Sequence, residues 1–515
     1  MKGRSSRGHR FGRLSLVLGL FAWSPPGFAE EPTVQTVDDL VVSGDLETPP
    51  AYGDDVVPGE RRRPLSLDEV LASVDVSYPL LIAVRQELEL AEGDLLAARG
   101  SFDSRLFARG EAAPTGYYDR YVADLGIEQP TRAWGSRLYA GYRIGRGDFP
   151  ADLGGVKTNE DGELRAGLEI PLLKDGMVDA ARTNLRVNEI KRRSAEPRIE
   201  LRRLEIVRQA SEAYWNWVAM GLNVDVERHL LRAAEDRRAQ LEGRAARGAI
   251  PAIQVVDNER LIVDRAIRLR GAERDALEAA VTLSLFFRDA NGDMKIPDRV
   301  SLPRDFPEES TGDGDRLAAD IARASERHPI LRELSLRREG LLATLSLNRN
   351  ALLPDLRVGV EGSQDVGKSS AGIDSSGSLS DNPKDDTEVK ATFRFEVPAL
   401  QRGARGRVAS NRAELIRLEQ ETRYARDAVE AEIRRSMAAL EAAFDQTRLA
   451  RKNYELAARL QLGEERKFEL GSSNLIDVNI REIQTADAAR ALLFAQAAYF
   501  RAVARYEAAI AGSRT

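Results

Sequence analysis

The sequence contains no cysteine. This absence excludes disulfide bonds, thiolate metal ligands, cysteine nucleophiles and a lipid anchor on an N-terminal cysteine. Histidine is nearly absent too, and a histidine metal site needs clustered ligands. The scattered His9, His229 and His328 are therefore expected to have no metal role. We expect no cofactor and no enzymatic activity.

Long apolar runs are also missing. The longest apolar-leaning run after the N-terminus covers residues 279–287, far short of the roughly 20 residues that a membrane-spanning helix needs. Only helices and closed barrels satisfy every backbone group in lipid, so this chain could cross a membrane only as a barrel. Aromatic residues make up 6% of the sequence and charged residues 31%, which is typical of long, surface-rich helices.

The N-terminus has the pattern of a secretory signal peptide. Residues 1–29 hold five basic residues and no acidic one, and their apolar run is followed by the small residues Gly27 and Ala29. We expect cleavage after Ala29, with an uncleaved anchor as the alternative. Residues 30–65, acidic and proline-rich, are interpreted as a disordered leader. The net charge of −6 becomes more negative after cleavage, so nothing indicates nucleic-acid binding.

Three landmarks occur twice in the same order. Residues 77–81 match residues 327–331, residues 170–173 match residues 397–400, and residues 248–255 match residues 471–478. The chain is therefore interpreted as a duplication. The first repeat covers residues 66–290 and the second covers residues 316–512, with a linker at residues 291–315. Each repeat is predicted to contain a helix, strands, a long helix, a turn and another helix.

The long helices are predicted at residues 178–247 and 407–470, and each would be roughly 90–105 Å long. In the second helix Val429, Ile433, Met437, Leu440 and Phe444 recur at spacings of three and four. This spacing is typical of coiled coils. The same spacing occurs in any solvated coiled coil, so the helices alone do not define a function.

Short segments with strict alternation set this chain apart from an ordinary coiled coil. Apolar and polar residues alternate in residues 164–170, 356–361 and 389–397. A period of two predicts a sheet with one apolar and one polar face, as in membrane barrels. A soluble, half-buried sheet alternates identically and remains the alternative.

Residues 121–127 and 136–144 form an additional strand pair, and the sequence leaves open whether it joins the barrel. Aromatic residues typical of a lipid–water boundary cluster around this pair, namely Tyr117, Tyr118, Tyr121, Trp134, Tyr139 and Tyr142. A barrel needs about eight strands, which is more than either half supplies. Several copies are therefore expected to share one barrel.

A phosphate-loop match at residues 362–369 is rejected. The motif requires a helix to open directly after its lysine and serine. Here Lys368 and Ser369 are followed by a stretch rich in serine and glycine, which is typical of a flexible segment. The segment is interpreted as an exposed loop between two strands.

In combination, these features resemble the TolC-like outer-membrane efflux family over about residues 66–512. The features are the signal peptide, the duplicated halves, Pro79 and Pro329, the strand-to-helix junctions at Pro171 and Pro398, and the glycine turns at Gly248 and Gly471. The resemblance implies a mainly α fold with a β-barrel portion. Duplicated long helical hairpins would form a periplasmic coiled-coil tunnel, and amphipathic strands would contribute to a membrane β-barrel shared by a homotrimer.

The resemblance also implies a function, a location and partners. The protein would be a passive duct in outer-membrane lipid with a periplasmic helical extension, serving tripartite efflux or type I secretion. Its partners would be a periplasmic adaptor (membrane-fusion) protein and an inner-membrane pump of the RND or ABC type. The alternatives are a periplasmic adaptor itself or a structural coiled-coil protein of the cell envelope. An adaptor has one hairpin, whereas this sequence predicts two.

Finally, the resemblance assigns roles to residues at the helix tips. Asp477 matches the family's inner carboxylate ring at the periplasmic aperture, although an acid also suits any helix N-terminus. Ile480 stands where a second carboxylate is frequent, and Asp257 is a candidate to supply that charge. Phe468 and Ser473 replace gate-holding residues, so the closed state is expected to be held differently. The tips expected to face the adaptor are Gly248, Ala249, Ile250, Phe468, Gly471, Ser472, Ser473, Leu475 and Val478.

Overall fold

The computed structural model describes residues 63–149, 156–310, 316–368 and 386–512. The chain divides into two units between Gly53 and Asp54, and all of the described residues lie in the second unit, Asp54–Thr515. The predicted signal peptide, its predicted cleavage site at Ala29 and nearly all of the predicted leader lie outside the described residues. The leader is predicted to extend through residue 65, but Leu65 is buried. Its amide donates to the Ser301 carbonyl and its carbonyl accepts from the Tyr214 hydroxyl, so the packed chain begins before the predicted boundary.

The second unit contains eight α-helices among its described residues, four in each half of the chain. The first half holds α1 (Leu67–Ser77), α2 (Pro79–Arg99), α3 (Ala180–Ala246) and α4 (Ile253–Ser284). The second half holds α5 (Leu317–Arg327), α6 (Pro329–Asn350), α7 (Arg402–Glu469) and α8 (Leu475–Ala509). The two long helices thus lie within a few residues of their predicted bounds, and α3 continues through Pro197.

Local sequence explains several helix boundaries. Ser66 and Glu69 form a reciprocal capping box at the start of α1, which satisfies two otherwise free amides. Pro79 and Pro329 are the first residues of α2 and α6, where proline costs nothing because the first amides of a helix have no partner within it. The equivalent landmarks of the two halves therefore begin equivalent helices.

The strands form one antiparallel, six-stranded sheet in the order β1-β2-β3-β4-β5-β6. Their bounds are β1 Arg105–Ala113, β2 Arg120–Pro130, β3 Arg137–Gly147, β4 Glu163–Pro171, β5 Asp355–Asp365 and β6 Thr387–Glu396. All five predicted strand segments are confirmed. The additional pair, β2 and β3, is part of the same sheet and lies between β1 and β4. The two halves of the chain meet where β4 pairs with β5.

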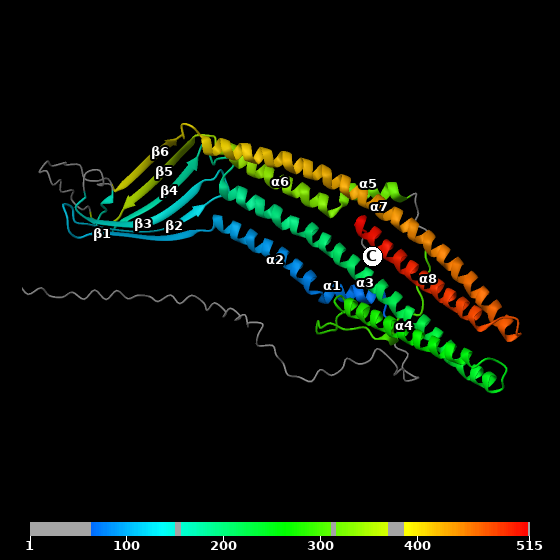
Figure 1. Cartoon of the computed structure of the whole chain (residues 1–515). Helices are drawn as coiled ribbons and strands as arrows, with labels where there is room; N and C mark the ends of the chain where they lie inside the picture. The colour runs from blue at the N-terminus through cyan, green and yellow to red at the C-terminus, as the bar shows by residue number, and fades with distance from the viewer. Residues whose placement is uncertain (1–62, 150–155, 311–315, 369–385, 513–515) are drawn as a thin grey trace, which may run out of the picture. The chain divides into compact units, whose positions relative to one another are not determined.

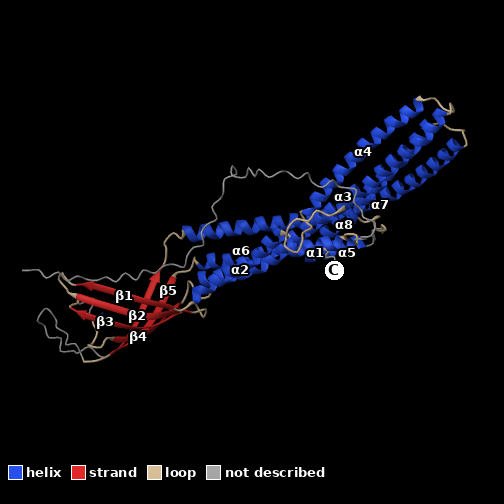
Figure 2. Ribbon diagram, turned by 90° about the horizontal axis from the view of Figure 1, so that it is seen from below, coloured by secondary structure: helices blue, strands red, loops and turns tan. Residues whose placement is uncertain are grey.

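The helices form a single layer that continues from the sheet (Figure 1). Beside the sheet the neighbours run α2, α3, α6, α7, and farther away they run α4, α3, α8, α7. Figure 2 shows the strands at one end of this unit and the α3–α4 and α7–α8 tips at the other. The layer and the sheet share their edges, because β1 leads out of α2 on one side and β6 leads into α7 on the other.

The predicted linker at residues 291–315 is a packed element where the structure describes it. Phe306 lies in a stack with Trp215 of α3 and Phe500 of α8, with ring centroids 5.8 and 5.9 Å away. Tyr499 of α8 donates its hydroxyl to the Ser310 carbonyl at 2.7 Å. The segment therefore ties the first hairpin to the second. No described helix is both long and apolar enough to cross a bilayer.

Candidate functional site

The apolar face of the sheet is its exposed face. The strand register places Ala108, Leu125, Tyr142 and Leu164 side by side on β1 to β4, and this row continues onto β5. The same face carries large side chains that are mostly open, such as Phe393 of β6, which is 72% exposed. Among the described residues, this face also exposes Leu106, Ile127, Leu138, Val360, Val389 and Phe395.

The opposite face is charged, yet it is the more buried of the two. Arg165 of β4 donates to Asp124 of β2, and their side chains are only 13% and 12% exposed. Arg143 of β3 pairs with Glu163 of β4 at 2.5 Å. Charged groups at low exposure need partners, and these pairs supply them across neighbouring strands. The sheet is therefore inverted relative to a soluble one, whose apolar face would pack on a core.

Tyr139 explains how the polar face becomes enclosed. Its ring lies across Gly167 of β4, where an added Cβ would come within 2.4 Å of it, and its hydroxyl donates to Glu361 of β5. Only glycine leaves room for a ring lying flat on a strand in this way. The sequence predicts that Tyr139 belongs to an aromatic girdle at the lipid boundary. That prediction is wrong for this residue, because the register directs odd-numbered residues of β3 to the polar face.

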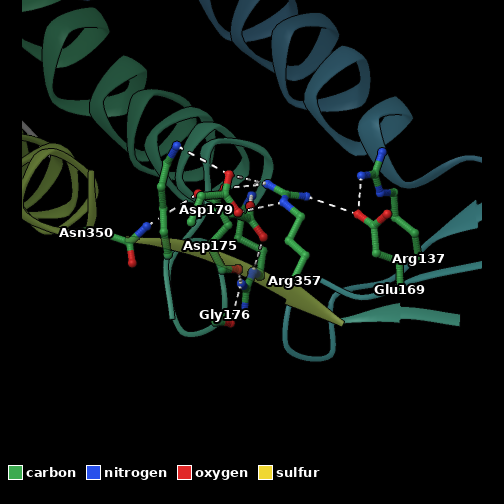
Figure 3. A network of polar contacts seen from close by, with 10 residues as sticks. Arg137, Glu169, Asp175, Gly176, Asp179, Asn350 and Arg357 are labelled. Carbon is green, nitrogen blue, oxygen red and sulfur yellow. Dashed lines mark hydrogen bonds and ion pairs between the residues drawn. The ribbon is translucent and has the colours of Figure 1, made fainter. Parts of the chain in front are cut away.

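A polar network fixes the sheet to the helices (Figure 3). Arg357 of β5 binds Glu169 of β4 at 3.3 Å and Asp175 of the β4–α3 loop at 3.0 Å. Asn350 at the end of α6 donates to Asp175 at 3.4 Å. Arg182 of α3 donates to the Asp175 carbonyl at 2.9 Å. Because strand, loop and two helices share these bonds, the orientation of the sheet on the helical layer is determined at this junction.

The two helix tips at the far end are built alike. Gly248 and Gly471 both have a positive φ, of 69° and 76°, which glycine adopts readily and which ends a helix. After α3 the Ala249 amide donates to the Arg244 carbonyl at 2.9 Å. After α7 the Ser472 amide donates to the Lys467 carbonyl at 2.8 Å. The tips expose Gly248, Ala249, Gly471 and Ser472, while Ile250 and Ser473 are partly buried.

Leu475 and Val478 correct the predicted adaptor-facing set. Both side chains are buried beneath the α7–α8 turn. They face inward because α8 packs against both α3 and α7, and the apolar side of its first turn lies against these neighbours. They support the tip and do not form part of its exposed surface.

The two candidate aperture carboxylates are exposed, Asp477 in the first turn of α8 and Asp257 just after the first turn of α4. Asp477 of α8 accepts from the side-chain amide of Asn474 at 2.9 Å, and its own amide donates to the Asn474 side chain at 3.0 Å. In the repeat match, Asp257 of α4 corresponds to Ile480 of α8, and Asp477 corresponds to Gln254. Negative charge is favourable at a helix N-terminus, so Asp477 suits its position in the first turn of α8 without a charged partner.

The predicted gate positions have local partners. Phe468 of α7 lies under the Arg244 guanidinium of α3, with 5.5 Å from Cζ to the ring centroid. Ser473 donates its hydroxyl to Glu464 at 2.5 Å. This hydrogen bond, together with the nearby Lys467, holds the pKa of the Glu464 carboxyl below its usual value. Ile480, where a second carboxylate is frequent in the family, is exposed.

A buried charge cluster behind the tips was not predicted. Glu482 of α8 accepts from Arg237 of α3 and from Arg265 of α4, the latter at 2.6 Å. Glu482 and Arg265 are each only 2% exposed. A sequence signal was available, because Glu482 lies on the buried stripe of α8 formed by Leu475, Val478 and Ala486. A carboxylate on such a stripe requires a buried partner.

The two edge helices each expose an apolar stripe. On α4 the stripe is Val256, Val263 and Ile267, and on α7 it is Leu449, Leu456 and Leu460. Both stripes have spacings of seven and four, which is the repeat of a coiled-coil seam. The two helices lie on opposite edges of the same layer, so neither stripe meets the other within one copy.

The first half of the rejected phosphate-loop match is strand and not the predicted loop, whereas residues 366–368 follow the strand. Gly362 to Asp365 are the last residues of β5, paired with β4 and β6, and Ser369 lies outside the described residues. Across the described ranges, no three histidine or acidic side chains come close enough together to hold a metal ion.

Solved structures share this architecture. The Campylobacter jejuni CmeC outer membrane channel is 14% identical, with a TM-score of 0.60 over 87% of this chain and 85% of that one. The outer membrane protein VceC from Vibrio cholerae is 14% identical, with a TM-score of 0.59 over 87% and 97%. The chain has the TolC-like fold. The open-state MtrE outer membrane channel of Neisseria gonorrhoeae has the same TolC-like fold, with 14% identity and a TM-score of 0.59 over 87% and 89%.

The TolC-like fold is recognised here through structure alone. No protein-family model matches the sequence, and no curated protein matches it either. The architecture predicted from the sequence, long paired helices with amphipathic strands, is confirmed.

Proposed function

We propose that this protein is the outer-membrane channel of a tripartite efflux or type I secretion system. In this role it is a passive duct from a periplasmic adaptor and an inner-membrane pump to the exterior. The sheet crosses the outer membrane, and the helical layer extends into the periplasm. A signal peptide at residues 1–29, cleaved after Ala29, delivers the chain across the inner membrane.

The inverted sheet is the observation that carries this proposal. Its exposed apolar face and enclosed charged face suit a wall with lipid outside and water inside. Its strands contain 9 to 11 residues, and about 9–11 residues cross a bilayer in a tilted strand. The exposed Tyr117 and Tyr121 lie near one end of the sheet and Trp134 near the other, as expected for residues at two lipid–water boundaries.

The open edges support assembly of several copies into a closed tube. Neither β1 nor β6 has a second strand partner among the described residues, and the α4 and α7 stripes also lack partners within one copy. A head-to-tail contact between the two edges of successive copies closes into a ring when the rotation between copies divides a full turn evenly. We propose a homotrimer, in which the α4 stripe of one copy packs on the α7 stripe of the next.

The tips are the proposed contact with the adaptor protein, and Asp477 and Asp257 are the proposed aperture charges. The small exposed residues at both turns allow close approach of another helical hairpin. Carboxylates repeated by symmetry around a narrow opening attract cations. The energy for export would come from the inner-membrane pump, of the RND or ABC type, because a passive duct supplies none.

The alternative function is a periplasmic adaptor or a structural coiled-coil protein of the cell envelope. Both would leave the apolar face of the sheet in water, where an exposed patch of this kind is a liability. Fractionation of a cell envelope separates these hypotheses. The channel should stay with the outer-membrane fraction until detergent is added, whereas either alternative should be released without detergent.

Conductance in planar bilayers tests the channel itself. We expect the purified wild-type protein to form pores that prefer cations, and Asp477→Ala to weaken this preference. Asp445→Ala, which removes an exposed carboxylate far from the tips, is the matched control and should keep wild-type selectivity. Absence of conductance from a reconstituted oligomer under any condition would refute the proposal.

A further inference from the structure

The β2–β3 hairpin has no counterpart in the second half of the chain. In the repeat alignment Leu106 and Glu111 of β1 correspond to Leu356 and Glu361 of β5, and Ile170 beside the end of β4 corresponds to Val397 beside the end of β6. In the second half the two equivalent strands pair directly with each other. In the first half β2 and β3 lie between them. The hairpin is thus a two-strand insertion into one repeat.

The inserted hairpin is hydrogen-bonded to the rest of the sheet on both sides. β2 and β3 pair with each other over their full lengths, β2 pairs with β1 from Arg120 to Glu128, and β3 pairs with β4 from Arg137 to Arg143. If the hairpin folded away from the wall, β1 and β4 would have to move together and pair directly, because unpaired backbone groups are very costly in lipid.

The insertion also keeps both faces of the sheet. On the apolar face, Ala140 of β3 stands directly beside Ala166 of β4, and both are exposed. On the polar face, Asp124 of β2 reaches past β3 to Arg165 of β4, and Tyr139 of β3 reaches past β4 to Glu361 of β5. Polar contacts that skip a strand require the hairpin to curve with its neighbours as one wall.

We propose that β2 and β3 form part of the membrane wall, so that three copies close an 18-stranded barrel. Each copy contributes six strands, and β1 of one copy pairs with β6 of the next. Because the number of strands in each copy is even, β1 and β6 run in opposite directions. The pairing of β1 with β6 of the next copy is therefore also antiparallel. This inference rests on the proposed function, since it requires a closed oligomer in a bilayer.

The insertion sets the width of the bore. With strands about 4.8 Å apart and tilted by about 40°, 18 strands give a backbone diameter of about 36 Å, against about 24 Å for 12 strands. Twelve is the count if β1 paired directly with β4 in each of three copies. Barrels of 16–18 strands enclose an open aqueous channel, so the outer opening would admit bulkier cargo.

Single-cysteine labelling tests the insertion, because the natural sequence has no cysteine to interfere. The hairpin variant is Ala140→Cys and its matched control is Ala166→Cys, on the adjacent strand in the same row. Glu128→Cys reports the polar face of the hairpin. Each variant is labelled with a fluorescent maleimide and reconstituted as the oligomer in phosphatidylcholine vesicles. Quenching is then measured with brominated lipid and with aqueous iodide.

We expect brominated lipid to quench the label at both Ala140→Cys and Ala166→Cys, and iodide to quench the label at Glu128→Cys. Lipid quenching at Ala166→Cys without lipid quenching at Ala140→Cys would overturn the inference and leave the proposed function standing. Lipid quenching at neither position would overturn both. A cryo-EM map of the same oligomer provides an independent count, for which 18 wall strands support the inference and 12 refute it.

Discussion

Glu482 shows how a single residue connects the two helical hairpins. It lies on α8, while its partners Arg237 and Arg265 lie on α3 and α4. A second buried carboxylate, Glu227 of α3, binds Arg490 of α8 at 2.5 Å. Both links join the first hairpin to the second behind the tips. In the proposed channel, any movement of one hairpin away from the other must break these pairs.

Removing the Glu482 carboxylate should destabilise the protein strongly. Glu482→Ala leaves two guanidinium groups with little exposure and no carboxylate between them, and breaking a buried pair in this way costs about 3–5 kcal/mol. Urea unfolding followed by tryptophan fluorescence measures the loss. The control is Glu430→Ala, which breaks an exposed pair with Arg434 and should cost less than about 0.5 kcal/mol. Equal losses in the two variants would contradict the buried role of Glu482.

Among the strands, the packing of Tyr139 on Gly167 is the feature most open to a direct test. Gly167→Ala places a methyl group where the ring lies, so Tyr139 must move and lose its hydrogen bond to Glu361. We expect a loss of about 1–3 kcal/mol, measured as a lower unfolding temperature in detergent.

Two comparisons isolate the cause of that loss. Gly362→Ala on β5 meets no atom within 4 Å and should leave the unfolding temperature nearly unchanged. In a Tyr139→Ala background, Gly167→Ala should also become nearly neutral, because the ring is no longer there. A full loss that persists in this background would show that the glycine acts through the backbone instead.

For the assembled molecule, the exposed stripe on α7 predicts a specific assembly defect. Leu449→Glu places a charge in the proposed seam with α4 of the next copy, where burying an unpaired carboxylate is costly. We expect dissociation of the oligomer with the helical content of each copy retained. Light scattering coupled to size-exclusion chromatography measures the mass, and circular dichroism measures the helices.

The control for this defect lies on a helix inside the layer. Gln484 of α8 is exposed, but α8 packs between α3 and α7 and is not at an edge. Gln484→Glu should therefore keep the oligomer intact. If Leu449→Glu also kept the wild-type mass, the proposed seam would lie elsewhere.

The sequence predicted the helices and strands well because their signals are local. Alternation of residue type identified β4, β5 and β6, and paired glycines identified both tips. Such local signals do not reveal contacts between segments that lie far apart in the sequence. Nothing local to Tyr139 indicates that it crosses Gly167 to reach Glu361, and nothing local to Leu475 indicates that α3 and α7 bury it. The sequence also predicted two faces for the sheet without determining which one is exposed.

The pairing of β4 with β5 has a consequence for the order of folding. β4 ends at Pro171, and β5 begins only at Asp355, so the central ladder of the sheet cannot form until most of the chain has been synthesised. Contacts of such long sequence separation form slowly. In the meantime β1 to β4 present an apolar surface with an unpaired edge, which invites aggregation. Until β5 pairs with β4, the first half of the sheet is therefore the part of the molecule most prone to aggregation.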